Sequence, residues 1–319
     1  MRAPSRSPMP DLDFLLKETN LLLASNGLPT CHSLAPVADG DTANPNAIAY
    51  SSERRYVVKV TQRHPHTLNH QLHVANALRD IADLPIPQHY CCATKGSRLP
   101  LMIMEWLPGA QLRTVLASAE HDELRKLCAS LASCLATFHH PDHLTLVPKA
   151  EGQHSGWLYT QTLEALQNVA GKPSHRTGAL DGIAVRRFLD ARLPALNAPA
   201  IPSLQKADQD LRDFLADPTG FEITGMLDWE QVTGGDGVFA IALFFFRLWL
   251  NAKLAGWETF TATYNRLATV EAEQCPQVEF YLMCRAVLAY RPDDRAKELV
   301  DLLLRGHRLP FESEQTWAR

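Results

Sequence analysis

The stretch of sequence that decides the fold is LQKADQDLRDFLADPTGFEITGMLDWE, residues 204–230. It contains two short apolar segments, one at Phe214 and Leu215 and one over residues 223–227, and Asp217-Pro218-Thr219-Gly220 lies between them. Proline and glycine between two apolar segments mark a turn between strands. The stretch therefore predicts a β-hairpin with a loop on either side.

Three aspartates flank the predicted hairpin. Asp213 directly precedes its first strand and Asp228 directly follows its second, so the hairpin would bring these two residues close together. Two carboxylates at one end of a hairpin can share Mg²⁺, a hard cation that takes oxygen ligands and completes its shell with substrate phosphates. Asp208 lies five residues before Asp213. Any one of these residues alone is more simply explained as a solvated turn residue, so the prediction depends on their spacing.

The order of these residues resembles the catalytic and metal-binding loops of the aminoglycoside phosphotransferase and choline kinase family, which has a protein-kinase-like fold. That family carries His-x-Asp-x-x-x-x-Asn, then a short hairpin, then Ile-Asp-Trp-Glu. Here the first motif reads Lys206-Ala207-Asp208-Gln209-Asp210-Leu211-Arg212-Asp213, and the second reads Leu227-Asp228-Trp229-Glu230. The first motif is degraded and the second is intact.

The resemblance implies a role for each of these residues. Asp208 would be the catalytic residue, and Asp213 and Asp228 would bind Mg²⁺, with Lys206 and Glu230 as possible supporting residues. Asp210 is a competing choice for the catalytic position, but only Asp208 has the five-residue spacing to a metal-ligand type at Asp213.

Three upstream features bear on the binding of nucleotide phosphates. Lys59 lies within an apolar strand predicted over residues 55–60; it is either a charge on an edge strand or, as the resemblance implies, the residue that contacts the phosphates. Gln71, on a helix predicted over residues 67–82, stands where the family has a glutamate that pairs with this lysine. A glutamine amide can still hydrogen-bond to Lys59, although Gln71 could equally be a surface residue. Gly40 lies in a turn-rich stretch at the position of the phosphate-covering loop, and is also compatible with a plain hairpin turn.

The segment Leu101-Met102-Ile103-Met104-Glu105-Trp106-Leu107-Pro108-Gly109 predicts a buried strand that ends in a turn. It resembles the family's hinge, where the backbone of Glu105, Trp106 and Leu107 would meet the adenine edge of ATP. Met104 and Trp106 are equally compatible with a role in the core.

The fold class implied by these features is α+β, with two lobes and a protein-kinase-like arrangement. Residues 1–108 would form a small N-terminal lobe with an antiparallel sheet, and residues 109–319 a larger, mainly helical C-terminal lobe. Long apolar periodicities, such as that over residues 122–139, favour helices in the second lobe. The nucleotide would bind between the lobes.

Composition limits the alternatives. A net charge of -4 argues against a general nucleic-acid-binding protein, and the excess of acidic over basic residues after residue 110 weakly favours a neutral or cationic acceptor. Seven cysteines without zinc-ligand spacing indicate free thiols. Residues 1–10 are not followed by the apolar core of a signal peptide. The apolar stretch 238–250 is too short to span a bilayer and is better explained as a buried helix. We therefore expect a cytoplasmic protein without a membrane partner.

Two main functional hypotheses follow. The first is a phosphotransferase that uses ATP and Mg²⁺ to phosphorylate a hydroxyl group of a small molecule. The second is a catalytically impaired member that binds nucleotide or a partner, which is favoured by the departures at Gln71, Lys206, Asp213 and Ala240 and by the glycine-poor loop. A third hypothesis keeps the fold but transfers another part of the nucleotide.

Overall fold

The computed structural model of the protein describes residues 9–37, 46–60, 65–81, 83–93, 99–146, 154–170, 180–197, 199, 201–206, 210–268, 276–289 and 295–306. Contacts between residues divide the chain into two compact units. Unit 1 contains Met1–Gly109, Asp213–Leu215 and Thr224–Gln231, and unit 2 contains the remaining segments. Both loops of the hairpin were expected in the C-terminal lobe, whereas the contacts group Asp213 and Asp228 with the N-terminal sheet.

Unit 1 is built on a five-stranded sheet in the order β1-β2-β3-β5-β4, in which every neighbouring pair is antiparallel. Two helices cover it, and the β8–β9 hairpin contributes most of its strand residues to this unit. The elements are α1 (Leu12–Ser25), β1 (Ser33–Pro36), β2 (Asn46–Tyr50), β3 (Arg55–Val60), α2 (Pro65–Leu78), β4 (Cys91–Ala93), β5 (Leu101–Glu105), β8 (Phe214–Ala216) and β9 (Ile223–Met226).

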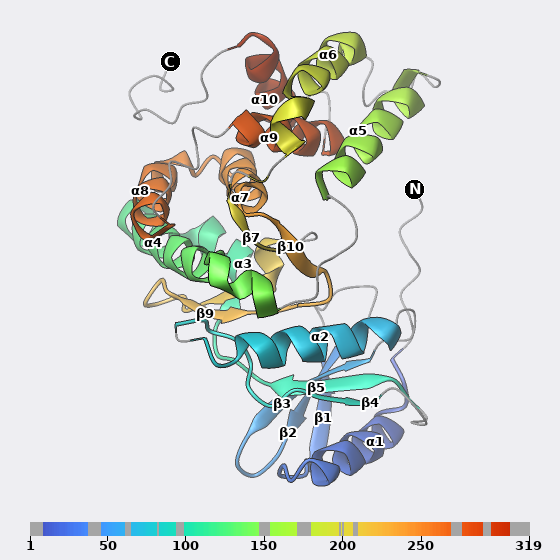
Figure 1. Cartoon of the computed structure of the whole chain (residues 1–319). Helices are drawn as coiled ribbons and strands as arrows, with labels where there is room; N and C mark the ends of the chain where they lie inside the picture. Colours follow the sequence, from blue (N-terminus) through green and yellow to red (C-terminus); the bar gives the residue numbers. More distant parts are fainter. Residues whose placement is uncertain are drawn as a thin grey trace. The chain divides into compact units, whose positions relative to one another are not determined.

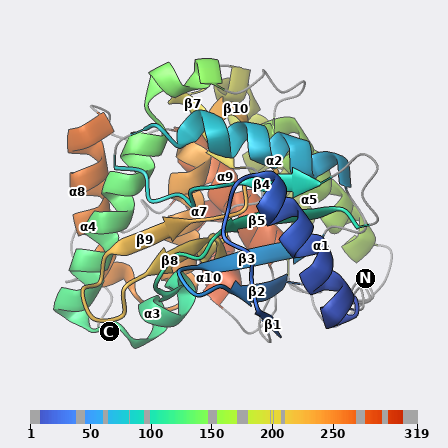
Figure 2. The ribbon, with the colours of Figure 1, turned by 90° about the horizontal axis from the view of Figure 1, so that it is seen from below.

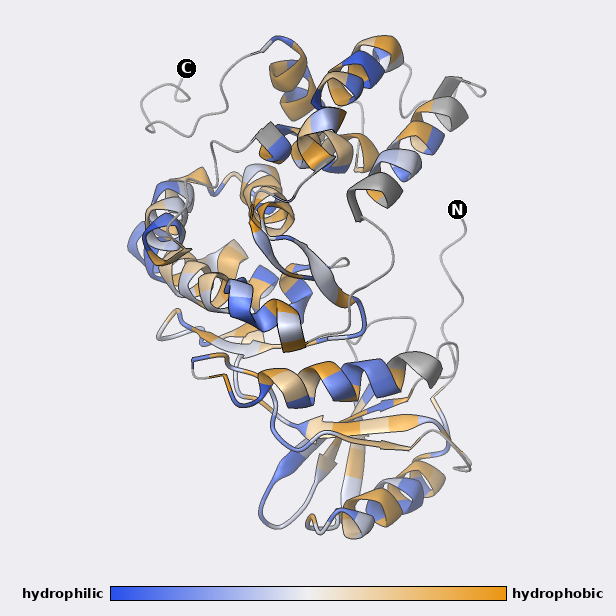
Figure 3. Ribbon diagram, viewed as in Figure 1, coloured by the Kyte–Doolittle hydropathy of each residue, from blue (hydrophilic) through white to orange (hydrophobic). Residues whose placement is uncertain are grey.

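Alternation along the strands gives the sheet two apolar faces, which the hydrophobic colour of β5 reflects (Figure 3). On one face, Tyr56, Val58 and Val60 of β3 share a core with Leu15 and Leu23 of α1. A smaller cluster on the other face contains Leu68 of α2 with Val57, Met102 and Met104. The helices α1 and α2 thus lie on opposite faces of the sheet (Figure 1), and α1 lies in front of it when seen from below (Figure 2). Lys59 falls on the α2 face.

Unit 2 is mainly helical, with a two-stranded antiparallel sheet formed by β7 and β10. Together with the antiparallel sheet of unit 1, it confirms the predicted two-lobed α+β fold. Its elements are β6 (Ala110–Gln111), α3 (Leu112–Ser118), α4 (His121–Phe138), η1 (Pro141–Leu146), α5 (His154–Ala170), α6 (Gly182–Arg192), η2 (Leu193–Asn197), β7 (Pro202–Lys206), η3 (Leu211–Asp213), β10 (Val232–Asp236), α7 (Val238–Leu250), η4 (Leu254–Gly256), α8 (Trp257–Ala268), α9 (Pro276–Leu288) and α10 (Arg295–Leu304).

The apolar stretch of the sequence forms α7, whose side chains are almost all buried. This confirms the buried helix predicted for residues 238–250. Within the described part of the chain, no helix combines the length and the apolar character that crossing a bilayer requires.

The six cysteines in the described residues are free thiols. Five of them are buried, and Cys92 is partly exposed. Burial raises the thiol pKa, to about 12 for Cys128 and Cys134 and to about 11 for Cys92. Because the thiolate is the nucleophilic form, these cysteines have little reactivity at neutral pH.

His139 caps the end of α4 inside unit 2. Its Nδ1 lies 2.8 Å from the hydroxyl oxygen of Tyr264, and its Nε2 is buried without a hydrogen-bond partner among the described residues. Burial lowers the imidazole pKa to about 3. The side chain is therefore neutral at physiological pH and serves as a packed core residue.

The stability of the protein should fall on acidification because of His139. Between about pH 6.5 and pH 3, this imidazole is neutral in the folded protein and protonated in the unfolded protein. The free energy of unfolding therefore falls as the pH falls through this range. Between pH 8 and pH 5, the free energy of unfolding of wild type should therefore fall by about 2 kcal/mol more than that of His139→Gln, as measured by urea denaturation. A constant difference would show that His139 has the same pKa in the folded and the unfolded protein.

The turn η4 packs so closely on α4 that it has no room for a side chain at Gly256. A Cβ added there would collide with Cys128 Sγ and lie 3.0 Å from Leu124 Cγ. Gly256→Ala should therefore lower the free energy of unfolding by about 1–3 kcal/mol, measured by urea denaturation. Gly182→Ala is the matched control, because its Cβ would meet only Leu166 Cδ2 at 3.9 Å. Equal stability of the two variants would contradict the close packing.

Candidate active site

Lys59 is the centre of a group of charged residues in unit 1. It lies on β3 between Val58 and Val60, and only 8% of its surface is exposed. Its Nζ donates a hydrogen bond of 2.7 Å to Asp228 Oδ1 and lies 3.7 Å from Glu230 Oε2. A lysine on an edge strand would be solvated, but β3 is an inner strand between β2 and β5. The alternative of an edge-strand charge is therefore wrong.

The hairpin brings Asp228 to this lysine. The amide of Met226 donates to the carbonyl oxygen of Pro85, and the amide of Leu227 donates to the carbonyl oxygen of Asp213, each at 2.7 Å. These bonds place the backbone at Asp213 beside the segment that leads into Asp228, as the hairpin pattern predicts. Asp228 itself has a φ of 65°, in the left-handed region that aspartate tolerates better than most residues.

Gln71 is buried rather than on the surface, and its partner is Glu230. None of its surface is exposed, and its Nε2 donates a 2.9 Å hydrogen bond to Glu230 Oε2. Its Oε1 has no partner among the described residues, so it does not accept a hydrogen bond from Lys59. Gln71 therefore makes neither the hydrogen bond to Lys59 that was one alternative nor the surface contacts that were the other, and Glu230 supplies a negative charge near Lys59 instead.

Trp229, between the two acidic residues, is fully buried and fixes the segment in place. Its Nε1 donates a 3.1 Å hydrogen bond to the hydroxyl oxygen of Tyr90. Burial raises the pKa of this tyrosine, so the hydroxyl stays neutral. Sequence reasoning did not identify Tyr90, because nothing in its local sequence indicates that a tryptophan far along the chain needs an acceptor.

The segment with Glu105, Trp106 and Leu107 directly continues from β5. The amides of Glu105 and Trp106 donate to the carbonyl oxygens of Gln88 and Arg55, at 3.2 and 3.1 Å. The guanidinium of Arg55 lies 3.6 Å from the centroid of the Trp106 ring. Leu107 is partly exposed, and its amide forms no hydrogen bond with a described residue. Of the three amides, that of Leu107 can still donate to a ligand.

Of three further predicted site residues, the structure describes one. Gly40 and Asp208 lie outside the described residues. Lys206 is the last residue of β7 in unit 2, pairs in register with Val232 of β10 and is 2% exposed. A buried lysine at this position is a structural part of the small sheet.

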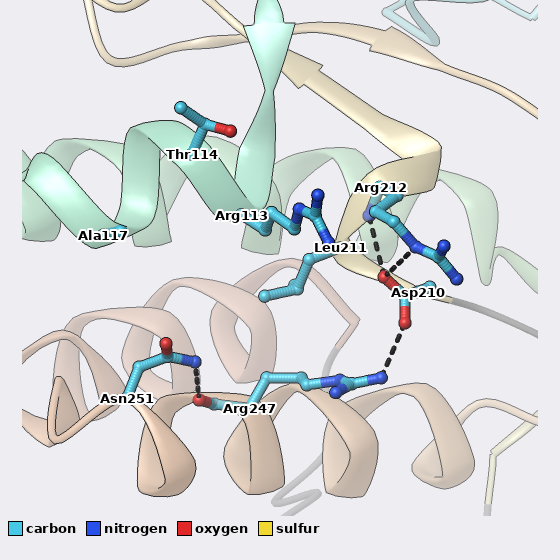
Figure 4. A pocket seen from close by; sticks show the side chains of 8 residues that line it. All are labelled: Arg113, Thr114, Ala117, Asp210, Leu211, Arg212, Arg247 and Asn251. Atoms are coloured by element: carbon cyan, nitrogen blue, oxygen red, sulfur yellow. Dashed lines mark hydrogen bonds and ion pairs between the residues drawn. The ribbon is translucent and has the colours of Figure 1, made fainter. Parts of the chain in front are cut away.

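Asp210, the competing catalytic candidate, is held by two arginines in unit 2. Its Oδ2 accepts a 2.6 Å hydrogen bond from Arg247 Nη2, and its Oδ1 accepts hydrogen bonds from the amide and Nε of Arg212, at 3.0 and 3.2 Å (Figure 4). Burial acts to raise the carboxyl pKa, but the Arg212 amide and the two guanidinium groups outweigh it and hold the pKa below its usual value. A carboxylate with both oxygens engaged in this way suits an anchor better than a proton acceptor.

The donor set of unit 1 fits Mg²⁺. Among the described residues, no cluster of three or more histidine, cysteine or acidic side chains could hold a metal ion. Asp213 and Asp228 flank one hairpin and are joined through the Leu227 amide. Mg²⁺ typically binds to one or two carboxylates and takes its other oxygen ligands from substrate phosphates and water. Asp228 beside a nearly buried lysine, with Asp213 at the other end of the same hairpin, is consistent with this chemistry.

An antiparallel sheet whose nearly buried lysine pairs with acidic residues of a distant hairpin, together with a mainly helical unit, is the arrangement of a kinase-like fold. The model of the family described as "Phosphotransferase enzyme family" matches residues 34–270, which is most of the chain. The chain therefore belongs to this family. Among curated proteins, none matches the sequence.

Solved structures of similar fold include aminoglycoside phosphotransferases. One is a thermostable mutant of APH(4)-Ia in a ternary complex with AMP-PNP and hygromycin B, with a TM-score of 0.59, 19% identity, and coverage of 90% of this chain and 97% of that one. Another is the streptomycin-ATP-APH(2")-IIa ternary complex, with a TM-score of 0.56, 14% identity, and coverage of 93% and 97%. A third, from Ralstonia eutropha JMP134 and provisionally called an aminoglycoside phosphotransferase, has a TM-score of 0.61, 14% identity, and coverage of 93% and 97%.

Gln71 stands where the family has a glutamate, and restoring the glutamate tests its contact with Glu230. Gln71→Glu should destabilise the protein by about 1–3 kcal/mol, because a second carboxylate would face Glu230 at a buried position. The double variant Gln71→Glu/Glu230→Gln should recover most of this loss, because the amide and the carboxylate then exchange places. Urea denaturation of the two variants and wild type measures both effects. Equal losses in the single and double variants would contradict the contact between residues 71 and 230.

Proposed function

We propose that this protein transfers the γ-phosphoryl group of ATP to a hydroxyl group of a small molecule, with Mg²⁺ as cofactor. The observation that carries the proposal is the 2.7 Å bond between Lys59 and Asp228, which joins the lysine of the sheet to the Asp-Trp-Glu segment. Membership of the phosphotransferase family supports it, as do similar structures described as complexes with ATP or AMP-PNP and an aminoglycoside.

Binding of the nucleotide would use three parts of unit 1. The ammonium of Lys59 would contact the phosphates, and the glycine of the loop at Gly40 would let the backbone approach them. The backbone of residues 105–107 would contact the adenine, and the unbonded amide of Leu107 is its available donor. Asp213 and Asp228 would hold Mg²⁺, which supplies positive charge to the phosphate oxygens when it is bound.

The transfer itself needs few groups from the protein. Asp208 would orient the acceptor hydroxyl and accept its proton as the hydroxyl oxygen forms a bond to the γ-phosphorus. The bond between the γ-phosphorus and the bridging oxygen breaks, and ADP leaves. Lys59 would keep the phosphates in line for this displacement, with Gln71 and Glu230 holding the lysine in place. Because phosphoryl transfer depends mainly on positioning and neutralisation of charge, this small set suffices.

Stabilisation by nucleotide provides the first test. ATP with Mg²⁺ should raise the free energy of unfolding of wild type, by about 2.7 kcal/mol at a ligand concentration of 100 times Kd. Asp228→Asn should lose the part of this increase that needs Mg²⁺, because it removes the metal-binding charge and keeps a residue type that tolerates a positive φ. Thermal denaturation with ATP alone, with ATP and Mg²⁺, and without ligand measures both effects.

The matched control is Asp142→Asn, which changes the same functional group at an exposed site. It should respond to Mg²⁺ and ATP as wild type does. If ATP fails to stabilise wild type with and without Mg²⁺, the proposed function is wrong and a module that binds other partners takes its place.

Loss of the catalytic carboxylate should separate turnover from binding. Asp208→Asn should lower the rate of ADP formation by about 10²–10⁴-fold, because the acceptor hydroxyl loses its proton acceptor. Its stabilisation by ATP and Mg²⁺ should equal that of wild type. The same assay on Asp210→Asn decides between the two candidates: a loss of turnover in this variant alone would assign the catalytic role to Asp210.

A further inference from the structure

Unit 2 contains a pocket that is lined by three arginines, one of which, Arg212, belongs to the predicted catalytic motif of residues 206–213. It has a volume of about 540 Å³ and is lined by Arg113, Thr114, Ala117, Asp210, Leu211, Arg212, Arg247 and Asn251 (Figure 4). We propose that this pocket binds a negatively charged group of the acceptor, a carboxylate or a phosphate ester. The proposal rests on the phosphotransferase function proposed above and names the class of acceptor.

The charges of the pocket favour an anion. Three guanidinium groups and one carboxylate line it, so its side chains carry a net positive charge. Arg212 and Arg247 both share the single carboxylate of Asp210. Arg113 comes from a different helix, is exposed, and forms no ion pair with a described residue. Cations that line one pocket repel one another, and an anionic ligand would relieve that repulsion.

Two of the three arginines, Arg212 and Arg247, are held in position before any ligand binds. Asp210 accepts hydrogen bonds from Arg212 and Arg247, and Asn251 Nδ2 donates a 2.7 Å hydrogen bond to the carbonyl oxygen of Arg247 (Figure 4). A planar guanidinium matches the two oxygens of a carboxylate or phosphate. Because Asp210 already orders the side chains of Arg212 and Arg247, binding an anion there costs less conformational entropy than at solvated arginines.

The pocket is close in the chain to the predicted catalytic residue. Asp210 follows Asp208 by two residues, which an extended chain spans in about 7 Å. A hydroxyl compound whose anionic group bound to the arginines would therefore lie within reach of Asp208. The bonds of Asp210 can be explained by its anchoring of the segment around it to α7. That role does not explain why Arg113, on α3, also lines the pocket.

The charge of the pocket differs from the overall charge of the C-terminal part. The acidic excess after residue 110 favours a neutral or cationic acceptor, but exposed charges farther away than about 8–10 Å are screened at physiological salt. The arginines that line the pocket act at contact distance. The local charge thus outweighs the average over the lobe.

Binding of simple anions tests the site directly. Glycerol 3-phosphate and 3-phosphoglycerate would be titrated calorimetrically into the full chain, with AMP-PNP and Mg²⁺ present to occupy the nucleotide site. Arg113→Gln should weaken binding of either anion by about tenfold or more, since it removes charged hydrogen bonds. Arg125→Gln, which makes the same change on an exposed residue of α4 outside the pocket, should bind as wild type does.

The release of ADP in the presence of acceptors tests the function of the pocket. Phosphorylated or carboxylated hydroxyl compounds should accelerate ADP release above the rate without acceptor, whereas hygromycin B and streptomycin should not. Arg113→Gln should raise the KM for the anionic acceptor more than it lowers kcat. Acceleration by an aminoglycoside that Arg113→Gln leaves unchanged would overturn the proposal.

The outcomes also distinguish this proposal from the phosphotransferase function. Binding of AMP-PNP that needs Mg²⁺, together with anion binding that Arg113→Gln does not weaken, would overturn the anion site alone. Absence of AMP-PNP binding would overturn the phosphotransferase function and the acceptor role of the pocket, even if Arg113→Gln still weakened binding of the anions.

Discussion

A nearly buried ammonium group is stable only beside negative charge, and Lys59 meets this need with two carboxylates from one short segment. Asp228 and Glu230 lie far from Lys59 in sequence, so the ion pairs join the sheet to a distant part of the chain. The hydrogen bond between Trp229 and Tyr90 fixes the residue between them. These contacts explain why the segment Thr224–Gln231 belongs to the unit that contains the sheet.

Local patterns in the sequence sufficed for much of the fold. The strand Arg55–Val60 and the helix Val238–Leu250 have the predicted limits, and the hairpin is present around its Pro-Gly turn. Each of these elements is determined by the period of its apolar residues and by turn residues a few positions away. The resemblance to a kinase-like family added the two-lobed arrangement, which the family match and the similar structures bear out.

Local sequence patterns could not predict the contacts between segments that are distant in the chain. The sequence gives no sign that Glu230 receives the amide of Gln71, since this depends on how α2 packs on the sheet. The arginine pocket combines residues of α3, η3 and α7, which only the tertiary structure brings together. One signal was available: a charged residue within the apolar helix α7 requires a partner, and Arg247 finds it in Asp210.

The left-handed backbone at Asp228 limits how this position can diverge. A residue with a φ of 65° is disfavoured for most side chains, but asparagine and glycine adopt it readily. Replacement of this aspartate by asparagine keeps the side chain's size and the backbone conformation and removes the charge. A lineage could therefore lose the proposed metal ligand by one conservative change while the Trp229 anchor and the sheet persist. In relatives of this chain, asparagine at this position would mark loss of the proposed phosphoryl transfer on an intact scaffold.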